Sequence, residues 1–365
     1  MEFTWNRIES KFLAGFSQLS YLQIMTHEFR KLIEVAFLNG QKNIRNVLAS
    51  VVALEGSSYR KPGVRMLISE EGKMTGAVSG GCVEKEVFHQ AQEVFETGKP
   101  KMMTYDGRYR LGCEGILYIL LEPFEIDRKT HNIFEEIFRT RQSFRLISEY
   151  DKNIETEAVL GTHAQIADSE KISFWKRLQK EAEVSLLFEQ EMSPLFKLLI
   201  IGAEHDAVQL CSLASMMGWE VDVVDSPKDP KKPDNFPGIN NLYHLFSEQL
   251  SELTFDKNMA VVLMNHSYVT DLKFLISLKD LELPYIGVLG SVKRREKLFN
   301  ELLERAPELE ENFFDSIYSP AGIKIGAETP QEIGVSIISE ILSVMRNKDI
   351  GHLREEKGKI HSEIE

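Results

Sequence analysis

The sequence predicts an α/β protein in which a small N-terminal α/β domain precedes a C-terminal domain with a doubly wound parallel sheet. Three observations support this fold class. The length of 365 residues is sufficient for two domains. Residues 25–124 combine apolar, strand-like stretches with amphipathic helices. Residues 195–346 alternate regularly between strand and helix, which is typical of a parallel sheet covered by helices on both faces.

The N-terminal domain is predicted from apolar periodicity and from residues that start or stop helices. Apolar side chains at positions 29, 32, 33, 36 and 37 share one helical face. In chain order we expect a helix after Met25 that Thr26 caps and Gly40 ends, strands 47–54 and 64–69, a hairpin turn at 70–72, a helix after Cys82 that ends at Gly98, and strand 116–121.

The remaining segments divide into a connector, the second domain and a tail. Residues 125–194 are interpreted as a connector and β-rich appendage, with strand-like pieces at 144–150 and 184–189. In the second domain we expect strands 196–201, 221–225, 259–264 and 285–289, a helix ending at Gly218, and helices 272–278, 293–304 and 331–345. Residues 347–365 form a charged tail.

The composition is that of an ordinary globular protein. Hydrophobic residues make up 43% and charged residues 27%, which excludes wholesale disorder. The 43 Lys and Arg residues against 56 Asp and Glu residues give a net charge of −13, which argues against nucleic acid or anionic membrane as partners. The longest apolar run near the strands, residues 116–121, is far shorter than the roughly 20 residues that a membrane span needs.

Cysteine usage and the N-terminal residues predict a reducing, cytoplasmic setting. Cys82, Cys113 and Cys211 are too few, and odd in number, for a disulfide framework. Residues 1–24 contain acidic residues and no small-residue cleavage site, unlike a signal peptide. We interpret them as an N-terminal extension, which either comes from an upstream start codon or acts as a docking arm.

Several common catalytic motifs are absent from the sequence. There is no P-loop, no Gly-x-Ser-x-Gly turn, no His-Glu-x-x-His and no Cys-x-x-Cys. The nine histidines are scattered, and no pair has the sequence spacing of metal ligands. The sequence therefore gives no support to a zinc hydrolase or a serine hydrolase.

The first positive signal is Ser79-Gly80-Gly81-Cys82 at the start of a predicted helix. Glycines let the backbone approach a ligand, and a helix N-terminus attracts anions and lowers the pKa of a thiol. Cys82 is therefore a candidate thiolate. The structural alternative is a tight turn around a small buried cysteine. Glu84, in the first turn, either compensates the helix dipole or accepts hydrogen bonds from a ligand's amino groups.

Two further segments of the N-terminal domain carry candidate ligand groups. The loop 56–63, with Arg65 just beyond it, gathers hydroxyls and cations that suit phosphate or carboxylate groups. Cys113 lies between two glycines before a strand and is a second soft sulfur ligand or persulfide carrier. The alternatives are a solvated loop and a buried structural cysteine.

A fourth signal, at residues 201–207 of the second domain, is similar to a dinucleotide-binding turn. Gly202 follows a strand, Asp206 lies in the next helix, and Asp225 ends the following strand, where a ribose-binding acid lies in such folds. However, Glu204 occupies the position of the second glycine, where its carboxylate would repel a pyrophosphate. Possible nucleotide-binding residues are thus Gly202, Asp206 and Asp225, although NAD(P) is not the favoured ligand.

Taken together, these ordered motifs resemble the XdhC/CoxI family. The matching segments are 56–66, 80–84 and 111–115 in the N-terminal XdhC/CoxI-type domain, and 287–291 and 319–330 in the Rossmann-like C-terminal domain. The resemblance covers most of residues 25–345. Two features depart from the family pattern, because Glu204 replaces a glycine and no arginine follows Asp225.

The resemblance implies an accessory factor that binds the molybdenum cofactor (molybdopterin) transiently, without turnover chemistry of its own. It also implies assistance in cofactor sulfuration by a cysteine desulfurase, insertion into a molybdenum hydroxylase apoenzyme such as xanthine dehydrogenase, and a homodimer. The residues assigned to the cofactor are Ser57, Ser58, Arg60 and Arg65 for phosphate or pterin oxygens, Gly80 and Gly81 for backbone contacts, Glu84 for pterin amines, Cys82 as the thiol nearest molybdenum, and Cys113 as the second thiol.

Two alternative functions stay open on the sequence. One is a nicotinamide-dependent oxidoreductase that uses the Rossmann-like domain, which predicts NAD(P) affinity that rises when Glu204 is replaced by glycine. The other is a protein that docks a client hydroxylase without holding its cofactor. Client binding would then be indifferent to both N-terminal cysteines.

Overall fold

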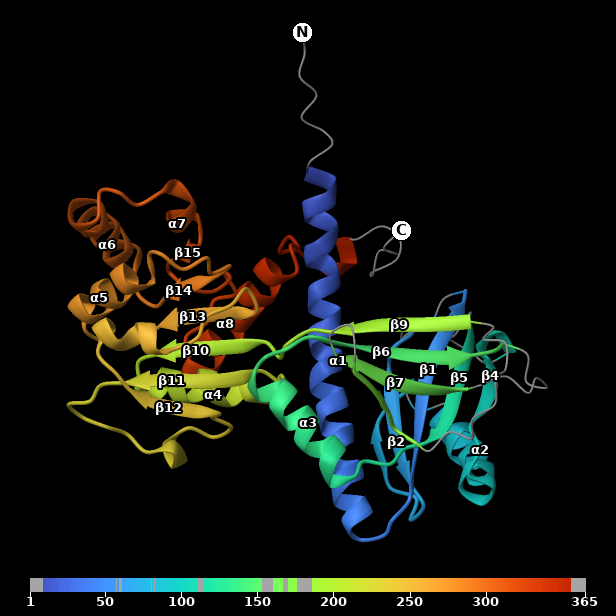
Figure 1. Ribbon diagram of the computed structural model, residues 1–365. Coiled ribbons are helices and arrows are strands. Elements are labelled where there is room, and N and C mark those ends of the chain that lie inside the picture. Colours follow the sequence, from blue (N-terminus) through green and yellow to red (C-terminus); the bar gives the residue numbers. More distant parts are fainter. Residues whose placement is uncertain are drawn as a thin grey trace. The chain divides into compact units, whose positions relative to one another are not determined.

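Figure 1 shows the computed structural model, which describes residues 9–56, 58, 61–79, 81, 83–109, 115–152, 160–166, 170–175 and 186–355. The chain divides into two units. One comprises Tyr21–Pro194, here the N-terminal unit, and the other comprises Leu195–Glu365 with the residues before Tyr21, here the C-terminal unit. No helix among the described residues combines the length and the apolar character that crossing a membrane requires.

The first helix, α1 (Glu9–Gln41), starts earlier than the sequence suggested. The predicted start after Met25 with a cap at Thr26 is wrong, because a threonine marks a helix start only where the preceding chain leaves the helix. No proline in residues 9–25 forces it to do so. Thr26 is instead a buried residue inside α1, and its hydroxyl donates a hydrogen bond to the carbonyl of Ser193 at 2.8 Å.

The N-terminal unit contains a five-stranded antiparallel sheet in the order β3-β2-β1-β5-β4. Its strands are β1 (Asn46–Glu55), β2 (Arg65–Ser69), β3 (Met74–Gly76), β4 (Lys101–Asp106) and β5 (Ile116–Pro123), with a 3₁₀ turn at Gly107–Tyr109. Helix α2 (Glu84–Thr97) packs on this sheet through one apolar stripe and ends at Gly98 in a left-handed conformation. The strands and the helix predicted for this region are confirmed.

The residues that were interpreted as a connector contain a second sheet and a helix. Strands β6 (Phe144–Tyr150), β7 (Gly161–Ile166), β8 (Glu170–Ser173) and β9 (Leu186–Met192) form an antiparallel sheet in the order β8-β7-β6-β9. Helix α3 (Arg128–Arg139) was not predicted, although Asp127 caps it by accepting a hydrogen bond from the backbone of Thr130 at 2.7 Å.

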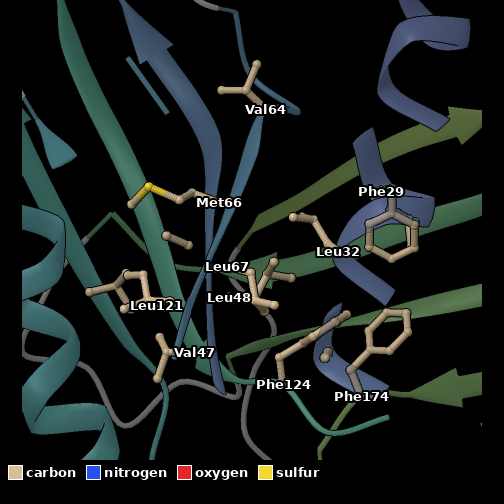
Figure 2. Packing of buried hydrophobic residues seen from close by; sticks show 14 of the residues in the cluster. Phe29, Leu32, Val47, Leu48, Val64, Met66, Leu67, Leu121, Phe124 and Phe174 are labelled. Carbon is tan, nitrogen blue, oxygen red and sulfur yellow. The ribbon is translucent and has the colours of Figure 1, made fainter. Parts of the chain in front are cut away.

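A cluster of aromatic rings joins these elements into one core (Figure 2). Phe29 of α1 is 1% exposed, and its ring centroid lies 5.8–6.3 Å from those of four other phenylalanines. These are Phe124 after β5, Phe134 of α3, Phe144 of β6 and Phe174 after β8. Residues 125–192 therefore share their core with residues 25–124.

The C-terminal unit is a six-stranded parallel sheet in the order β12-β11-β10-β13-β14-β15. This is the 3-2-1-4-5-6 strand order of doubly wound, Rossmann-type domains, so the predicted α/β fold class is confirmed. The strands are β10 (Lys197–Ile201), β11 (Glu220–Asp225), β12 (Asn241–His244), β13 (Met259–Leu263), β14 (Ile286–Val288) and β15 (Ile317–Tyr318).

Helices cover both faces of this parallel sheet (Figure 1). They are α4 (His205–Met216), α5 (Tyr268–Leu278), α6 (Val292–Arg305), α7 (Glu311–Asp315) and α8 (Pro330–Met345), with short 3₁₀ segments at Pro233–Asn235, Ser247–Glu252 and Leu353–Glu355. Alternate residues of β10 enter different hydrophobic layers. Leu198 and Ile200 face α4 and α8, whereas Leu199 and Ile201 belong to the layer of α5 and α6.

We expect the substitution Phe29→Ala to lower the free energy of unfolding of the N-terminal unit by about 3–5 kcal/mol, because it leaves a cavity between four rings. Urea unfolding measures this loss. The matched control is Leu38→Ala on the same helix, which is 52% exposed and should change stability by no more than about 0.5 kcal/mol. Equal effects of the two substitutions would contradict a core centred on Phe29.

Candidate functional site

The strand directions bring the three motif loops of the N-terminal unit to one end of its sheet. Strands β1, β3 and β4 run in the same direction, because each pairs antiparallel with β2 or β5. The loops 56–64, 77–83 and 107–115 follow these three strands, and therefore all leave the sheet at the end toward which β1, β3 and β4 point. The register confirms this for two strands, because Glu55 of β1 and Asp106 of β4 both pair with Ile116.

Several of the assigned residues in these loops lie outside the described part of the chain. They are Ser57, Arg60, Gly80, Cys82 and Cys113, so the roles given to their side chains stay predictions. Ser58 is described and half-buried. Gly81, which immediately precedes Cys82 in the sequence, is also described.

Gly81 presents open backbone at the start of α2. Its φ of +114° favours glycine, and a Cβ added to it would meet no atom within 4 Å among the described surroundings. An exposed glycine of this kind lets a bound molecule approach the main chain at a helix N-terminus. Binding of an anionic ligand at this position stays a prediction.

Ser79 and Glu84 clamp the loop that precedes α2. The hydroxyl of Ser79 donates to Oε2 of Glu84 at 2.7 Å, and the backbone N–H of Ser79 donates to Oε1 at 2.8 Å. The same hydroxyl accepts hydrogen bonds from the backbone of Gly81 and Val83 at 3.2 and 3.3 Å. Glu84 thus fixes the loop. Each of its carboxylate oxygens keeps a second lone pair that could accept a hydrogen bond from a pterin amine, so that contact stays a prediction.

The hydrogen bonds to Glu84 also set its protonation. Partial burial by itself would raise the pKa of the Glu84 carboxyl, but hydrogen bonds from Ser79 and from the backbone of the loop outweigh it and lower the pKa below the ordinary value of 4.5. Glu84 is therefore ionised at neutral pH and keeps the loop closed.

Arg65 lies inside the N-terminal unit, at 4% exposure, which differs from the expected contact with cofactor oxygens. One of its terminal nitrogens donates to the carbonyl of Gly63 at 2.8 Å and to the side chain of Gln190 on β9. Its guanidinium also lies 5.7 Å from the ring centroid of Phe29. The geometry assigns Arg65 to holding the end of the loop 56–63, and not to the surface of the site.

The backbone at Gly63 favours glycine, and a larger residue would displace the side chain of Gln190. The φ of Gly63 is +102°, and a Cβ at this position would lie 2.7 Å from Nε2 of Gln190. The loop 56–63 is therefore fixed at its carboxyl-terminal end by a side chain from the second sheet. Sequence reasoning missed Gln190 because nothing in the pattern of β9 links it to a loop 125 residues earlier in the chain.

A rim of charged groups lies at the same end of the sheet. Nζ of Lys152, after β6, is 2.5 Å from Oε1 of Glu55 and 4.9 Å from the ring centroid of Tyr118. A hydrogen bond from Lys152 is the main cause that lowers the pKa of Glu55. Arg108 pairs with Asp106 at 2.6 Å. The sequence places Glu55 next to the motif loop, so its position near the site could have been predicted. The pairing of Lys152 with Glu55 could not, because it depends on tertiary structure.

In the C-terminal unit, Gly202 serves close packing between two strands. It follows β10 with a φ of +125°, and a Cβ there would lie 2.8 Å from the backbone carbon of Met264. Glu204 is the N-cap residue of α4, is exposed and makes no capping hydrogen bond with its side chain, and Asp206 adds a second carboxylate in the first turn. Two carboxylates at this helix start oppose the binding of a pyrophosphate.

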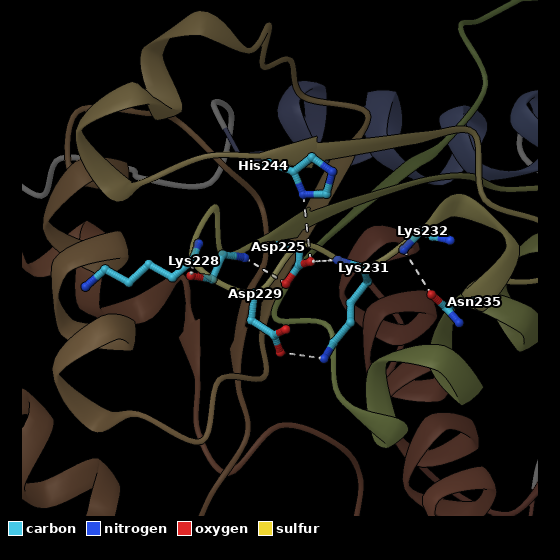
Figure 3. Close-up of polar contacts among 8 residues, drawn as sticks. Asp225, Lys228, Asp229, Lys231, Lys232, Asn235 and His244 are labelled. Carbon is cyan, nitrogen blue, oxygen red and sulfur yellow. Dashed lines mark hydrogen bonds and ion pairs between the residues drawn. The ribbon is translucent and has the colours of Figure 1, made fainter.

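The carboxylate of Asp225 is engaged by its own loop (Figure 3). One oxygen accepts from the backbone of Ser226 at 2.7 Å and the other from the backbone of Lys231 at 2.6 Å. Nδ1 of His244 lies 3.8 Å away, and Asp225 is 6% exposed. The acid that would bind a ribose therefore stabilises the 226–231 turn instead.

We expect Glu84→Gln to lower the free energy of unfolding by about 1 kcal/mol at neutral pH, because a charged acceptor of two hydrogen bonds is lost at a partly exposed site. Since the pKa of Glu84 is lowered in the fold, its stabilisation is present above about pH 4.5 and is lost as the pH falls through the folded-state pKa. The difference between wild type and variant should therefore shrink on acidification.

Urea unfolding at a series of pH values measures this difference. The matched control is Glu71→Gln, in the exposed hairpin turn before β3, which should differ little from wild type at any pH. A deficit of Glu84→Gln that is independent of pH would contradict the clamp between Glu84 and Ser79.

Comparison with known proteins places these features in one family. The sequence profile of the XdhC and CoxI family matches residues 41–106, and that of the XdhC Rossmann domain matches residues 198–341. The first match contains the loop 56–63 and the loop clamped by Ser79 and Glu84. The second match contains the turn at Gly202 and the loop after Asp225.

Individual relatives and a solved structure agree with this placement. The chain is 30% identical to a Bacillus subtilis protein named as a probable subunit of xanthine dehydrogenase (82% of this chain, 93% of the relative). It is 23% identical to the molybdenum cofactor insertion chaperone PaoD of Escherichia coli (89% and 91%). A crystal structure from Bacillus halodurans, described as a xanthine dehydrogenase, matches with a TM-score of 0.72 and 28% identity (87% and 96%). The chain therefore belongs to the XdhC and CoxI family.

Proposed function

We propose that this protein is an accessory maturation factor that binds the molybdenum cofactor and assists its sulfuration and insertion into a xanthine dehydrogenase-type hydroxylase. The observation that carries the proposal is that the three motif loops follow β1, β3 and β4, which all point toward the same end of the N-terminal sheet. The names of two relatives support it, because one is a cofactor insertion chaperone and the other is named as a probable part of xanthine dehydrogenase.

The cofactor is the cargo of this site, and its chemistry fits the groups that surround the loops. It carries a phosphate, hydrogen-bonding pterin edges and a metal with soft ligands. The exposed chain at Gly81, shortly before the positive end of α2, leaves room for an anionic group to approach. Ser57, Ser58 and Arg60 in the neighbouring loop supply hydroxyl donors and a cation for phosphate or pterin oxygens.

Cys82 and Cys113 supply the sulfur chemistry in this proposal. Cys82 lies two residues before the first residue of α2, where the helix dipole favours a thiolate that contacts molybdenum or transferable sulfur. Cys113 lies in sequence between β4 and β5, within one of the three motif loops. Cys211 has no such role, because burial raises the pKa of its thiol to about 12.

The partners follow from the same chemistry. A cysteine desulfurase supplies the sulfur, and a molybdenum hydroxylase apoenzyme receives the loaded cofactor. The protein works in the cytoplasm as a homodimer, and it holds and transfers the cofactor without turning over a substrate. The competing function is docking of the client hydroxylase without binding of the cofactor. The measurement below distinguishes cofactor binding from docking alone.

We expect the protein to co-purify with near-stoichiometric pterin and molybdenum when it is expressed in cells that make the cofactor and is purified without oxygen. Cys82→Ala should reduce both contents strongly, and Cys113→Ala should reduce them less, because soft thiolates hold the metal. Pterin fluorescence and metal analysis of the denatured protein give the two contents.

The matched control for the two thiols is Cys211→Ala, which removes the buried cysteine of the C-terminal unit and should leave both contents unchanged. Absence of pterin and metal from the wild type would favour docking without cofactor. Normal loading of the client by a Cys82→Ala, Cys113→Ala double variant would refute the roles given to the thiols.

For the Rossmann-type unit we expect no binding of NADH by the wild type or by Glu204→Gly in a fluorescence titration. Removing Glu204 relieves repulsion of the pyrophosphate, but both oxygens of Asp225 still accept hydrogen bonds from the 226–231 turn. Tight NADH binding by Glu204→Gly that Asp225→Asn abolishes would contradict this assignment and restore the dehydrogenase hypothesis.

A further inference from the structure

Helices α1 and α3 lie side by side and carry none of the motif loops (Figure 1). They bring three metal-ligating side chains together. Glu34 comes from α1, and His131 and Glu135 lie one helical turn apart on α3. One ligand atom from each residue lies within 4.8 Å of the other two. The spacing of two residues on one helix with a third from a neighbouring helix is a common way to build a metal site.

The imidazole of His131 is held in position before any ion binds. Its ring stacks on Phe37 of α1, with centroids 3.9 Å apart and an interplanar angle of 18°. The side chain is 15% exposed, and Nε2 lies 3.0 Å from Oε1 of Glu34. Because the ring is fixed by stacking, little rotamer freedom is lost when Nε2 becomes a ligand.

We propose that Glu34, His131 and Glu135 form a binding site for a divalent transition-metal ion such as Zn²⁺. One imidazole nitrogen and two carboxylate oxygens are suitable ligands for this class of ion, and water completes the coordination. Bonds of about 2.0–2.2 Å in a tetrahedral site leave ligand atoms about 3.3 Å apart. The Glu34–His131 pair is already near this separation, and Glu135 reaches it by rotating a flexible side chain.

The charges around the site allow a dication. The two carboxylates contribute a charge of −2, which a divalent ion neutralises. Arg30 is a competing cation, with a terminal nitrogen 3.9 Å from Oε1 of Glu135, at the outer limit of an ion pair. Its guanidinium also lies 5.1 Å from the ring centroid of Phe138, so it keeps a partner when Glu135 turns toward the ion. The guanidinium of Arg128 lies over Phe37 at 5.5 Å.

A bound ion would tie α1 to α3 across the aromatic core of the N-terminal unit. The Glu34–His131 contact already bridges the two helices, and the ion replaces one hydrogen bond by three coordinate bonds. The expected consequence is stabilisation of the helix pair. This proposal is independent of cofactor binding, because none of its ligands lies in the motif loops.

The test is a titration of chelator-treated full-length protein with Zn²⁺, and with Co²⁺ for its absorption spectrum. We expect one ion per chain and, at a free concentration one hundred times the dissociation constant, a rise of about 5–10 °C in the unfolding midpoint. His131→Ala should weaken binding by tenfold or more, since even outer-shell partners of metal ligands contribute that much.

A second variant and a control keep this test decisive. Glu135→Gln preserves shape while removing a charged ligand, so it should also weaken binding if His131→Ala folds poorly. The control is His89→Ala, which removes an exposed histidine on α2 and should leave the affinity unchanged. Equal affinity of wild type, His131→Ala and Glu135→Gln, or no rise in the unfolding midpoint of the wild type with Zn²⁺, would overturn the proposal.

Discussion

The pairing of β1 with both β2 and β5 is the constraint on which the N-terminal unit depends. Seven consecutive residues from Asn46 are buried, so the strand is covered on both faces. Every other strand of the sheet takes its direction from β1 through antiparallel pairing. Strands β3 and β4 must therefore run parallel to it, and the loops that follow β1, β3 and β4 have to emerge together.

A bulge in the same strand directs the first of these loops. The register between β1 and β5 shifts between Val51 and Ala53, which leaves Val52 as an extra residue. Bulges bend and twist a strand and are common beside functional sites. Here the bulge lies shortly before Glu55, and Arg65 with Gln190 then fixes the far end of the loop at Gly63. Together with the hydrogen bonds between Ser79 and Glu84, these contacts fix described residues of two of the three loops.

Local patterns predicted most elements of the fold, and failed where tertiary contacts decide. Strand 144–150 was placed correctly because its apolar residues and flanking turns suffice to define it. Helix α3 was missed although Asp127 caps it, because its surroundings were interpreted as β-rich. The role of Arg65 was not predictable, because only the packing of β9 shows that a motif arginine points inward.

The candidate site shows the same division between local and long-range information. The motif order located the loops, since glycines and cysteines next to predicted strand ends are visible in one chain. The position of those loops at one end of the sheet depends on strand pairing, and the placement of Lys152 beside Glu55 depends on a second sheet. Neither follows from spacing, because the partners lie far apart in sequence and meet only through tertiary contacts.

The C-terminal unit shows why a Rossmann-type strand order does not by itself imply dinucleotide binding. The strand order reverses between β10 and β13, and polar side chains of the protein bind one another there. The amide of Asn265, just after β13, donates to the carbonyl of Ile201 and to buried Asp271. Arg294 of α6 donates to the same carboxylate. These three side chains therefore bind one another within the fold, and the sheet is stabilised by the hydrophobic layers on its two faces.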